Sequence, residues 1–418
     1  MNKKAVAMLL SAAMASGMVA TPVLADEIEL TMYHSWGEEE QRGKALYEAV
    51  DQFNEQHKGE IKITVDVNND FPAYQEKCKT MVSTGTAPDI FHYNFNPNDL
   101  SLQESGKLFD FTSYMDDEWK QRFGEGDLDM VTVDGKLTSI PFEKAGAVWY
   151  YNTELFDKAG ISTFPTTWDE LLEDCEKLKE IGVVPFTLYT ADDAWYTCNL
   201  LTYLAASYAG TDALNAGGSL NTNEMVEAAT MLRRLMDYTT NDFIGANYSV
   251  ASSNFVAEKT AIVIDGSWFI DTAEPIKDKV AIAQAPTFGD DVVKPGYLVT
   301  DAQTPWACGT QDDPAKADAI VTFMKYITSP DVIKQLTLDG GVFASEKFDI
   351  TDEDREAAGP LMSSYIDANL NATGSVVNLQ RNLSKQANAL LPSLLESLKL
   401  DQITPEEFIQ QLDDANNS

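Results

Sequence analysis

Apolar and polar positions near the start of the chain follow two different periods. They alternate in twos over residues 28–33, which predicts a β-strand. Over residues 38–58 the apolar positions recur every three or four residues, which predicts a helix that ends at Gly59. A second alternating segment at 61–67 predicts another strand.

The same succession continues along the chain. We expect a helix over about 74–83, a turn from Gly85 to Asp89 and a strand at 90–93. The order strand, helix, strand, helix, strand is typical of an α/β domain in which helices cover both faces of a mostly parallel sheet.

Helix-start motifs mark the middle of the chain. Thr167 and Glu170 have the spacing of a capping box, which predicts a helix from there to Gly182, followed by a strand at 183–188. Asp313-Pro314 and Ser329-Pro330 predict two successive helices, because proline is favoured at the first helical position. Helices placed end to end suit a crossing between two lobes, and the chain beyond about Asp349 reads as wholly helical.

The composition excludes several classes of protein. With 66 acidic and 30 basic side chains in 418 residues, the formal net charge is −36, which argues against a nucleic-acid or anionic-membrane partner. A hydrophobic content of 44% excludes wholesale disorder. At roughly 150 residues per domain, the length predicts two or three domains.

The first residues resemble an export signal. Lys3 and Lys4 precede an apolar run, and small residues lead to Ala25. This pattern predicts a secretory signal peptide over residues 1–25, cleaved after Ala25. The apolar run is shorter than the roughly 20 residues that a membrane-spanning helix needs. Because no cysteine lies near this site, we expect an unlipidated protein in a periplasm or outside the cell.

The cysteines and histidines give little indication of a disulfide framework or a metal site. The scattered cysteines are either buried free thiols or include one disulfide, for which Cys175 and Cys198 are the candidates. His34 and His92 each follow an expected strand, so both could face one crevice. The chain offers no third histidine to complete a metal site with them, and we predict neither a metal nor a cofactor.

Enzyme motifs are missing from the sequence. It contains no nucleophile elbow, no phosphate-binding loop, no zinc-protease motif and no dinucleotide fingerprint. A carboxylate pair for glycoside hydrolysis stays open, because so many acidic residues guarantee chance pairs. We therefore assign no catalytic residue.

The tryptophans carry more information. Trp168 belongs to a predicted apolar helix face, and Trp119 is either packed or exposed. The other five of the seven follow strands or lie beside Gly, Ser or Pro, where ligand-binding loops of α/β sheets occur. Flat aromatic faces beside carboxylates and amides suit a sugar, and we expect about two or three of the five to touch a ligand. The five are Trp36, Trp149, Trp195, Trp268 and Trp306.

Four segments together resemble a known family. The chain is similar to the extracellular solute-binding protein family 1, the substrate receptors of carbohydrate ABC importers, which includes the maltose-binding type. The segments, in the family's order, are STGTAPDI at 83–90, WYYNTELFDKAGI at 149–161, PTTWDEL at 165–171 and FVAEKTAIVIDGSW at 255–268.

The resemblance implies a two-lobed periplasmic-binding-protein fold of type II. Each α/β lobe would be a mostly parallel sheet flanked by helices, and a hinge of several crossovers would join the lobes. The implied crossings fall near 140–145, 285–291 and 327–330. The N-lobe would then comprise residues 26–141 plus 288–327, and the C-lobe residues 142–287 plus 328–418.

The resemblance also implies the ligand-binding residues. They come from loops of both lobes, and two of them replace a Gly-rich stretch that many relatives have at 301–306. The implied set is Trp36, Glu38, His92, Tyr93, Asn94, Glu143, Trp195, Trp268, Gln303 and Trp306.

The function implied by the resemblance is capture and delivery. A monomeric receptor would close on a sugar or oligosaccharide and dock on the permease subunits of an ABC transporter, with no role for nucleic acid. Two alternatives stay open: a receptor for a cationic solute such as a polyamine, suggested by the acidic charge, and a secreted carbohydrate-active enzyme. Affinity for a cationic solute would fall with salt, whereas sugar binding would hardly change.

Overall fold

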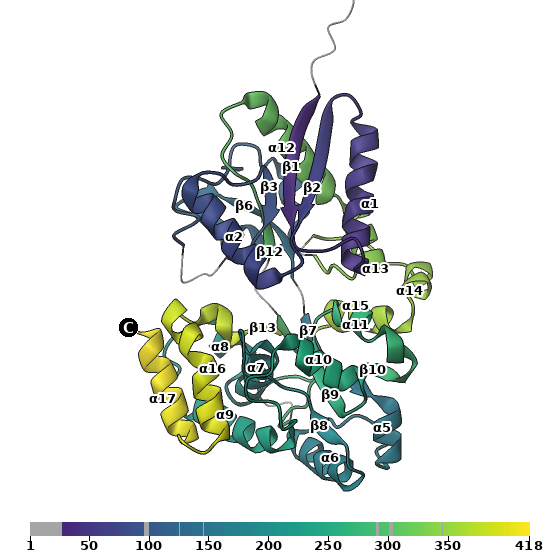
Figure 1. Cartoon of the computed structure of the whole chain (residues 1–418), viewed down its shortest axis with the longest axis vertical. Coiled ribbons are helices and arrows are strands. Elements are labelled where there is room, and N and C mark those ends of the chain that lie inside the picture. The colour runs from purple at the N-terminus through teal and green to yellow at the C-terminus, as the bar shows by residue number, and fades with distance from the viewer. Residues whose placement is uncertain are drawn as a thin grey trace, which may run out of the picture.

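Two α/β lobes lie one above the other and are joined at a narrow waist (Figure 1). The computed structural model describes residues 27–95, 100–124, 126–144, 146–289, 292–300, 304–344 and 346–418. The expected signal peptide over 1–25 lies outside the described residues. Each lobe has its own cluster of buried apolar side chains around its sheet. The two-lobed α/β architecture is therefore as predicted.

The N-lobe is built on a five-stranded sheet with the order β2-β1-β3-β12-β6. β1 and β2 are parallel and in register from Ile28 opposite Ile61 to His34 opposite Val67, and β3 is parallel to β1. The strands are β1 (Ile28–His34), β2 (Ile61–Val67), β3 (Ile90–His92), β6 (Ser139–Glu143) and β12 (Thr304–Ala307), with the hairpin β4 (Thr132–Val133) and β5 (Lys136–Leu137) beside them.

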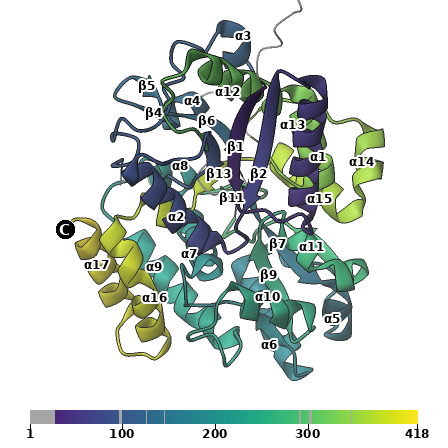
Figure 2. The same cartoon turned by 45° about the horizontal axis from the view of Figure 1, so that its top comes forward.

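Helices cover this sheet because each has one apolar face. The predicted helix after β1 is present, and its residues Leu46, Val50 and Phe53 are fully or almost fully buried. Its neighbour α13 lies alongside it (Figure 2). The N-lobe helices are α1 (Gln41–Gln56), α2 (Phe71–Thr84), α3 (Asp117–Lys120), α4 (Asp127–Met130), α12 (Pro314–Ile327) and α13 (Pro330–Gly340).

The C-lobe sheet has the order β13-β11-β7-β9-β8, and β10 also pairs with β7. Its longest strand, β7, lies in the middle and carries Trp149 into the core. The strands are β7 (Gly146–Asn152), β8 (Val184–Phe186), β9 (Thr260–Asp265), β10 (Val280–Ala283), β11 (Leu298–Thr300) and β13 (Ser375–Val377).

The capping box predicted at the start of the C-lobe is confirmed. Thr167 Oγ1 accepts a hydrogen bond from the Glu170 backbone N–H at 3.2 Å, and Glu170 Oε2 accepts from the Thr167 N–H at 3.2 Å. The helices here are α5 (Thr153–Lys158), α6 (Trp168–Glu180), α7 (Trp195–Ala209), α8 (Thr211–Asn215), α9 (Asn223–Leu235), α10 (Tyr248–Val256), α11 (Phe269–Thr272), α14 (Asp352–Ala358), α15 (Pro360–Leu370), α16 (Lys385–Lys399) and α17 (Pro405–Asn416), with 3₁₀ turns η1 (Met236–Tyr238), η2 (Glu274–Lys279) and η3 (Leu379–Asn382).

Both sheets are mixed rather than mostly parallel. β12 is antiparallel to both of its neighbours, and β7 is antiparallel to β9, β10 and β11. The physical reason is the connectivity, because β7 and β12 enter their sheets directly from the other lobe and so run against the strands that βαβ units place there.

The chain crosses between the two lobes at three places, and these differ in part from the expected ones. The first crossing, between β6 and β7, falls within the expected 140–145, but Phe142 and Glu143 belong to the N-lobe sheet rather than to the C-lobe. The second joins β11 to β12, across residues 300–304, rather than 285–291. The third follows residue 348, because α13 packs against the N-lobe core through Val332 and Ile333, and the segment after α13 stays with that lobe. Val342 and Ala344 belong to the N-lobe core, and the Lys347 N–H donates to the Arg122 carbonyl at 2.8 Å. Residues 292–300 thus belong to the C-lobe and 330–340 to the N-lobe.

One smaller expectation is corrected, and one question that the sequence left open is answered. The chain beyond Asp349 is not wholly helical, because β13 pairs with β11 in the C-lobe sheet. Cys175 and Cys198 form no disulfide, and all four cysteines are buried free thiols. Within the described ranges, no helix is both long enough and apolar enough to cross a membrane.

Candidate functional site

Trp36 lies where the N-lobe meets the C-lobe, in the loop that follows β1. Its side chain is only 4% exposed and stands edge-on to the rings of His34 and His92, at centroid distances of 4.3 and 5.3 Å. The loop is held close to helix α1, because Gly43 leaves no room for a side chain between the helix and the Gly37 carbonyl. The expected position of Trp36 at the carboxyl end of the sheet is therefore what the fold shows.

His34 and His92 form a buried stacked pair behind Trp36. Their ring centroids are 4.0 Å apart and the planes differ by 12°. The Trp36 backbone N–H donates to His34 Nδ1 at 3.0 Å, and Ser35 Oγ lies 2.9 Å from His92 Nε2. Burial lowers the pKa of His92 to about 3, and burial together with His92 and Arg42 holds the pKa of His34 well below its usual value. Both imidazoles are therefore neutral near pH 7.

The buried pair makes stability depend on pH. Below about pH 6.5 a histidine in the unfolded chain is protonated, whereas His92 in the folded protein stays neutral. The free energy of unfolding therefore falls as the pH falls toward 3. We expect His92→Gln to remove about 2 kcal/mol of the loss in unfolding free energy between about pH 6 and pH 4. Urea unfolding of both proteins at several pH values measures this difference, and parallel pH profiles would refute it.

Arg42, from the first turn of α1, connects the aromatic groups of the two lobes. Its Cζ atom lies 4.2 Å from the ring centroid of Trp36 and 5.3 Å from that of Trp268 in the C-lobe. Its Nη2 donates to Glu143 Oε1 on β6, and both side chains are buried. The guanidinium is thus placed between indoles of opposite lobes, which is a favourable cation–π arrangement.

Trp268 and Trp195 form the C-lobe side of the contact region between the lobes. Their ring centroids are 5.5 Å apart, and Trp195, at the start of α7, is 7% exposed. The loop after β9 brings Trp268 there and folds its indole back against Gly266. A continuous series of contacts therefore runs from Trp36 through Arg42 and Trp268 to Trp195, across both lobes.

A buried carboxyl group supports the loop that carries Trp268. Tyr196 donates its hydroxyl to Asp265 Oδ2, and the Gly266 N–H donates to Asp265 Oδ1 at 2.7 Å. Burial raises the pKa of Asp265 to about 7, against the opposing effect of the Tyr196 hydrogen bond. These bonds fix the backbone immediately before Trp268, so Asp265 acts as a positioning residue.

One hydrogen bond joins the rims of the two lobes directly. The Gln41 backbone N–H, at the N-terminus of α1, donates to Asp271 Oδ2 of the C-lobe at 2.7 Å. A carboxylate is favoured at this end of a helix, where backbone N–H groups are unpaired and the helix dipole is positive. The structure therefore shows the lobes in contact at α1.

Three other predicted site residues lie on or beside β3 and β12 of the N-lobe sheet. Trp306 is fully buried on β12, with its ring centroid 4.9 Å from Phe142 and 5.5 Å from His34. Asn94 accepts a hydrogen bond from Thr304 Oγ1 at 2.7 Å. Tyr93 packs on Phe95 at 4.9 Å. Gln303 lies outside the described residues.

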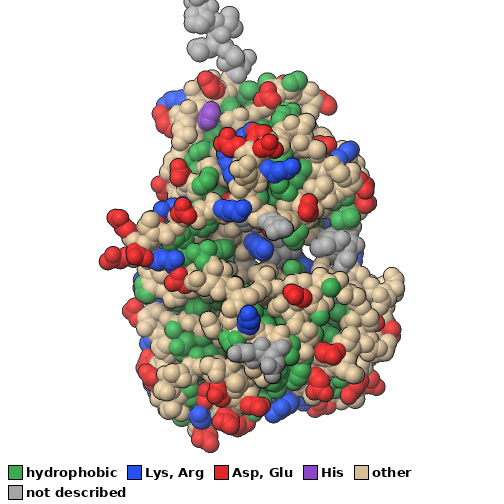
Figure 3. Space-filling model, turned by 180° about the vertical axis from the view of Figure 1, so that it is seen from behind, with side chains coloured by type: hydrophobic (Ala, Val, Ile, Leu, Met, Phe, Trp, Pro, Cys, Tyr) green, Lys and Arg blue, Asp and Glu red, His purple; other side chains and the backbone are tan. Residues whose placement is uncertain are grey.

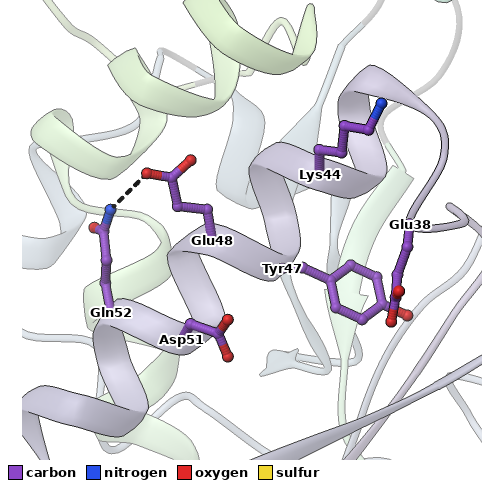
Figure 4. A pocket seen from close by; sticks show the side chains of 6 residues that line it. All are labelled: Glu38, Lys44, Tyr47, Glu48, Asp51 and Gln52. Carbon is purple, nitrogen blue, oxygen red and sulfur yellow. Dashed lines mark hydrogen bonds between the residues drawn. The ribbon is translucent and has the colours of Figure 1, made fainter.

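Glu38 lies apart from the interlobe aromatic residues. It is exposed beside Tyr47 on the outer side of α1, where it lines a shallow hollow (Figure 4). The other side chains lining that hollow are Lys44, Glu48, Asp51 and Gln52, and they point outward from the helix. The hollow contains one aromatic ring and no contribution from the C-lobe.

Three further tryptophans belong to the cores of the lobes. Trp149 is fully buried in the C-lobe, where its ring packs against Trp168 at 5.7 Å and Tyr203 at 5.6 Å. Trp119 is fully buried in the N-lobe, and its Nε1 donates to Thr328 Oγ1 at 2.9 Å. Trp168 is a core residue, as predicted.

Three residues of this region were not predicted from the sequence: Arg42, Asp265 and Asp271. Arg42 lies in the first turn of α1 and Asp271 in the short helix α11, and both contact the opposite lobe. The only local indication was that Asp265 directly precedes Gly-Ser-Trp at the end of a strand, where a buried carboxyl group can hold a loop.

Comparison with known proteins agrees with the fold. The family model described as "Bacterial extracellular solute-binding protein" matches residues 36–334. A solved structure from work on xylan utilization by Caldanaerobius polysaccharolyticus is 27% identical, with a TM-score of 0.78 over 93% of this chain and 99% of that one.

Relatives in curated collections match over shorter regions. A "Putative binding protein" of Brucella abortus (strain 2308) is 33% identical over 173 residues, 39% of this chain and 39% of that protein. A "Probable sugar-binding periplasmic protein" of Rhizobium meliloti (strain 1021) is 26% identical over 142 residues, 32% of this chain and 33% of that protein. The chain thus covers about two fifths or less of the length of these relatives.

Proposed function

Because the chain belongs to the bacterial extracellular solute-binding protein family, we propose that it captures a sugar or oligosaccharide between its two lobes outside the cytoplasm. The family resemblance predicted from the four sequence segments is confirmed. The observation that carries the proposal is the meeting of Trp36 from one lobe with Trp268 and Trp195 from the other, joined by Arg42.

The chemistry of this meeting point suits a saccharide. Indole faces offer broad apolar contact to the C–H faces of a sugar ring, and the neighbouring Arg42 and Glu143 offer a donor and an acceptor to its hydroxyl groups. A relative is named a sugar-binding periplasmic protein, and the similar solved structure comes from work on xylan utilization. Both names favour a carbohydrate ligand.

The mechanism is capture by closure. Open lobes exchange the saccharide with solvent, and a ligand that touches both walls favours the closed arrangement by its greater affinity for that arrangement. The closed monomer then docks on the permease subunits of an ABC importer and releases the saccharide to them. The protein performs no covalent chemistry and would reside in a periplasm or outside the cell.

The acidic surface gives little support to a cationic ligand. Acidic side chains are spread over both lobes in the rear view rather than gathered at the waist (Figure 3). At the interlobe site the Glu143 carboxylate is already paired with the Arg42 guanidinium. A polyamine receptor would need carboxylates that are free to bind ammonium groups.

Titration with a ligand panel tests the proposal. The panel contains maltotriose, cellotriose, xylotriose and triacetylchitotriose, with spermidine as the cationic comparison. We expect at least one saccharide to change the tryptophan fluorescence and to bind with a dissociation constant on the order of micromolar or tighter by calorimetry. The proposal would be contradicted if spermidine alone bound, or if no member of a much wider glycan library bound detectably.

The same samples separate a receptor from an enzyme. After prolonged incubation, mass spectrometry of the bound saccharide should find it intact. Accumulation of shorter fragments at catalytic rates would show hydrolysis and would replace the receptor by a carbohydrate-active enzyme.

A further inference from the structure

The ion pair between Arg42 and Glu143 occupies an unusual position. The two side chains are 10% and 8% exposed, and their bonded atoms are Arg42 Nη2 and Glu143 Oε1. Indoles from both lobes flank the guanidinium, so the pair lies at the place where a ligand would touch both walls. The sequence predicted Glu143 at the site but not Arg42.

The surroundings add little net charge to this pair. His34 and His92, on the N-lobe side, are kept neutral by burial. Tyr365, from α15, is neutral because burial raises its pKa. Asp271 is bonded to the α1 N-terminus, and Asp265 is held beneath the Trp268 loop by Tyr196 and Gly266. Arg42 and Glu143 thus contribute one cation and one anion, and the Asp271 carboxylate is partly compensated by the helix N-terminus to which it is bonded.

Arg42 also has hydrogen-bonding capacity to spare. Its Nε atom is buried and has no hydrogen-bond partner among the residues that the structure describes. A buried donor without a partner costs free energy, which a ligand oxygen beside Trp36 would recover. A hydroxyl group can supply that oxygen without bringing a charge.

We propose that the Arg42–Glu143 pair is a charge filter that restricts the site to uncharged saccharides. The inference rests on the proposed function and specifies its ligand class. A carboxylate on the ligand would compete with Glu143 for Arg42, and an ammonium group would compete with Arg42 for Glu143. Either competition leaves a buried charge of the protein without its partner, which is strongly unfavourable.

Replacing either Arg42 or Glu143 should weaken the preference for uncharged saccharides. In Glu143→Gln the guanidinium is unpaired and becomes a site for a ligand carboxylate. In Arg42→Gln the carboxylate is unpaired and becomes a site for a ligand ammonium group. Glu143→Gln keeps the size of the side chain and removes its charge. Arg42→Gln also removes the charge and keeps a donor, but it shortens the side chain and adds an acceptor.

Two matched pairs of trisaccharides serve as probes. Trigalacturonate is compared with its methyl ester, and the glucosamine trimer with its N-acetylated form, all at pH 6 by calorimetry or by competition. For the wild-type protein we expect the neutral member of each pair to bind at least about tenfold more tightly. Equal or tighter binding of either charged member would overturn the filter without any variant.

The variants test the direction of the effect. We expect Glu143→Gln to improve the relative affinity for trigalacturonate by about tenfold or more, and Arg42→Gln to do so for the glucosamine trimer. The matched control is Arg122→Gln, because Arg122 donates to the Lys325 carbonyl away from the site, and its ratios should equal those of the wild type. Circular dichroism confirms folding of each variant.

The outcomes distinguish the two proposals. Folded variants with wild-type ratios would overturn the filter and leave saccharide capture intact. If a variant does not fold, the wild-type ratios alone still decide. A wild-type protein that binds none of the four trisaccharides and no member of the earlier panel would overturn the proposed function and the filter with it.

Discussion

We expect Trp268→Ala to lower the affinity for the proposed saccharide ligand by about a hundredfold or more, because the indole would form the C-lobe side of the proposed site. Trp268 lies 5.3 Å from the Arg42 guanidinium and 5.5 Å from the Trp195 ring, so its removal opens the wall of the site on both sides. Calorimetry with the tightest-binding panel saccharide measures the loss.

A matched variant separates binding from general stability. Trp119→Phe removes an indole from the N-lobe core and its hydrogen bond to Thr328, without touching the interlobe region. It should lower the melting temperature and leave the dissociation constant unchanged. If Trp268→Ala binds within threefold of the wild type, the assignment of the C-lobe wall is wrong.

Gly43→Ala should destabilise the N-lobe by about 3 kcal/mol. Alanine normally stabilises a helix relative to glycine by up to about 1 kcal/mol, so propensity alone predicts the opposite sign. Here a Cβ at position 43 would lie 1.7 Å from the Gly37 carbonyl oxygen and 2.6 Å from its carbon. Both are backbone atoms, so α1 and the loop that carries Trp36 must separate.

Urea unfolding measures this effect, and saccharide binding should weaken with it because Trp36 and Arg42 move apart. The control is Gly374→Ala, whose Cβ would meet only Thr211 Oγ1, at 3.7 Å, and whose backbone does not require glycine. That variant should be close to the wild type. A Gly43→Ala protein as stable as the control would contradict the close packing of the loop on α1.

Local patterns predicted the elements well. The alternating segment at 61–67 corresponds to β2 (Ile61–Val67), and the capping box at Thr167 begins α6. These features depend on side-chain period and on hydrogen bonds within a few residues, so they can be read without knowledge of the rest of the fold.

Sheet direction and the crossings could not be read in this way. The apolar face of α13, with Val332, Ile333 and Leu336, would look the same whichever lobe it covered. Likewise β12 and β7 are buried strands whose direction is set by the lobe from which the chain arrives. Such choices depend on contacts between residues far apart in the sequence.

The candidate site was predicted in part. Trp36 and Trp268 come from loops that follow strands, as expected, and they lie on either side of the Arg42 guanidinium. Trp149 also belonged to the expected tryptophans, but it sits within β7 and packs in the core. Arg42 escaped notice because a polar residue in a first helical turn gives no indication that it will contact indoles from two lobes.

A crystal structure of the complex with the tightest-binding neutral saccharide is the most direct test of interlobe capture. The predicted result is a sugar ring against the indole of Trp268, with Trp36 on the opposite wall and a hydroxyl oxygen within hydrogen-bond distance of Arg42. A saccharide bound only in the hollow on the outer side of α1, with the interlobe indoles untouched, would contradict it.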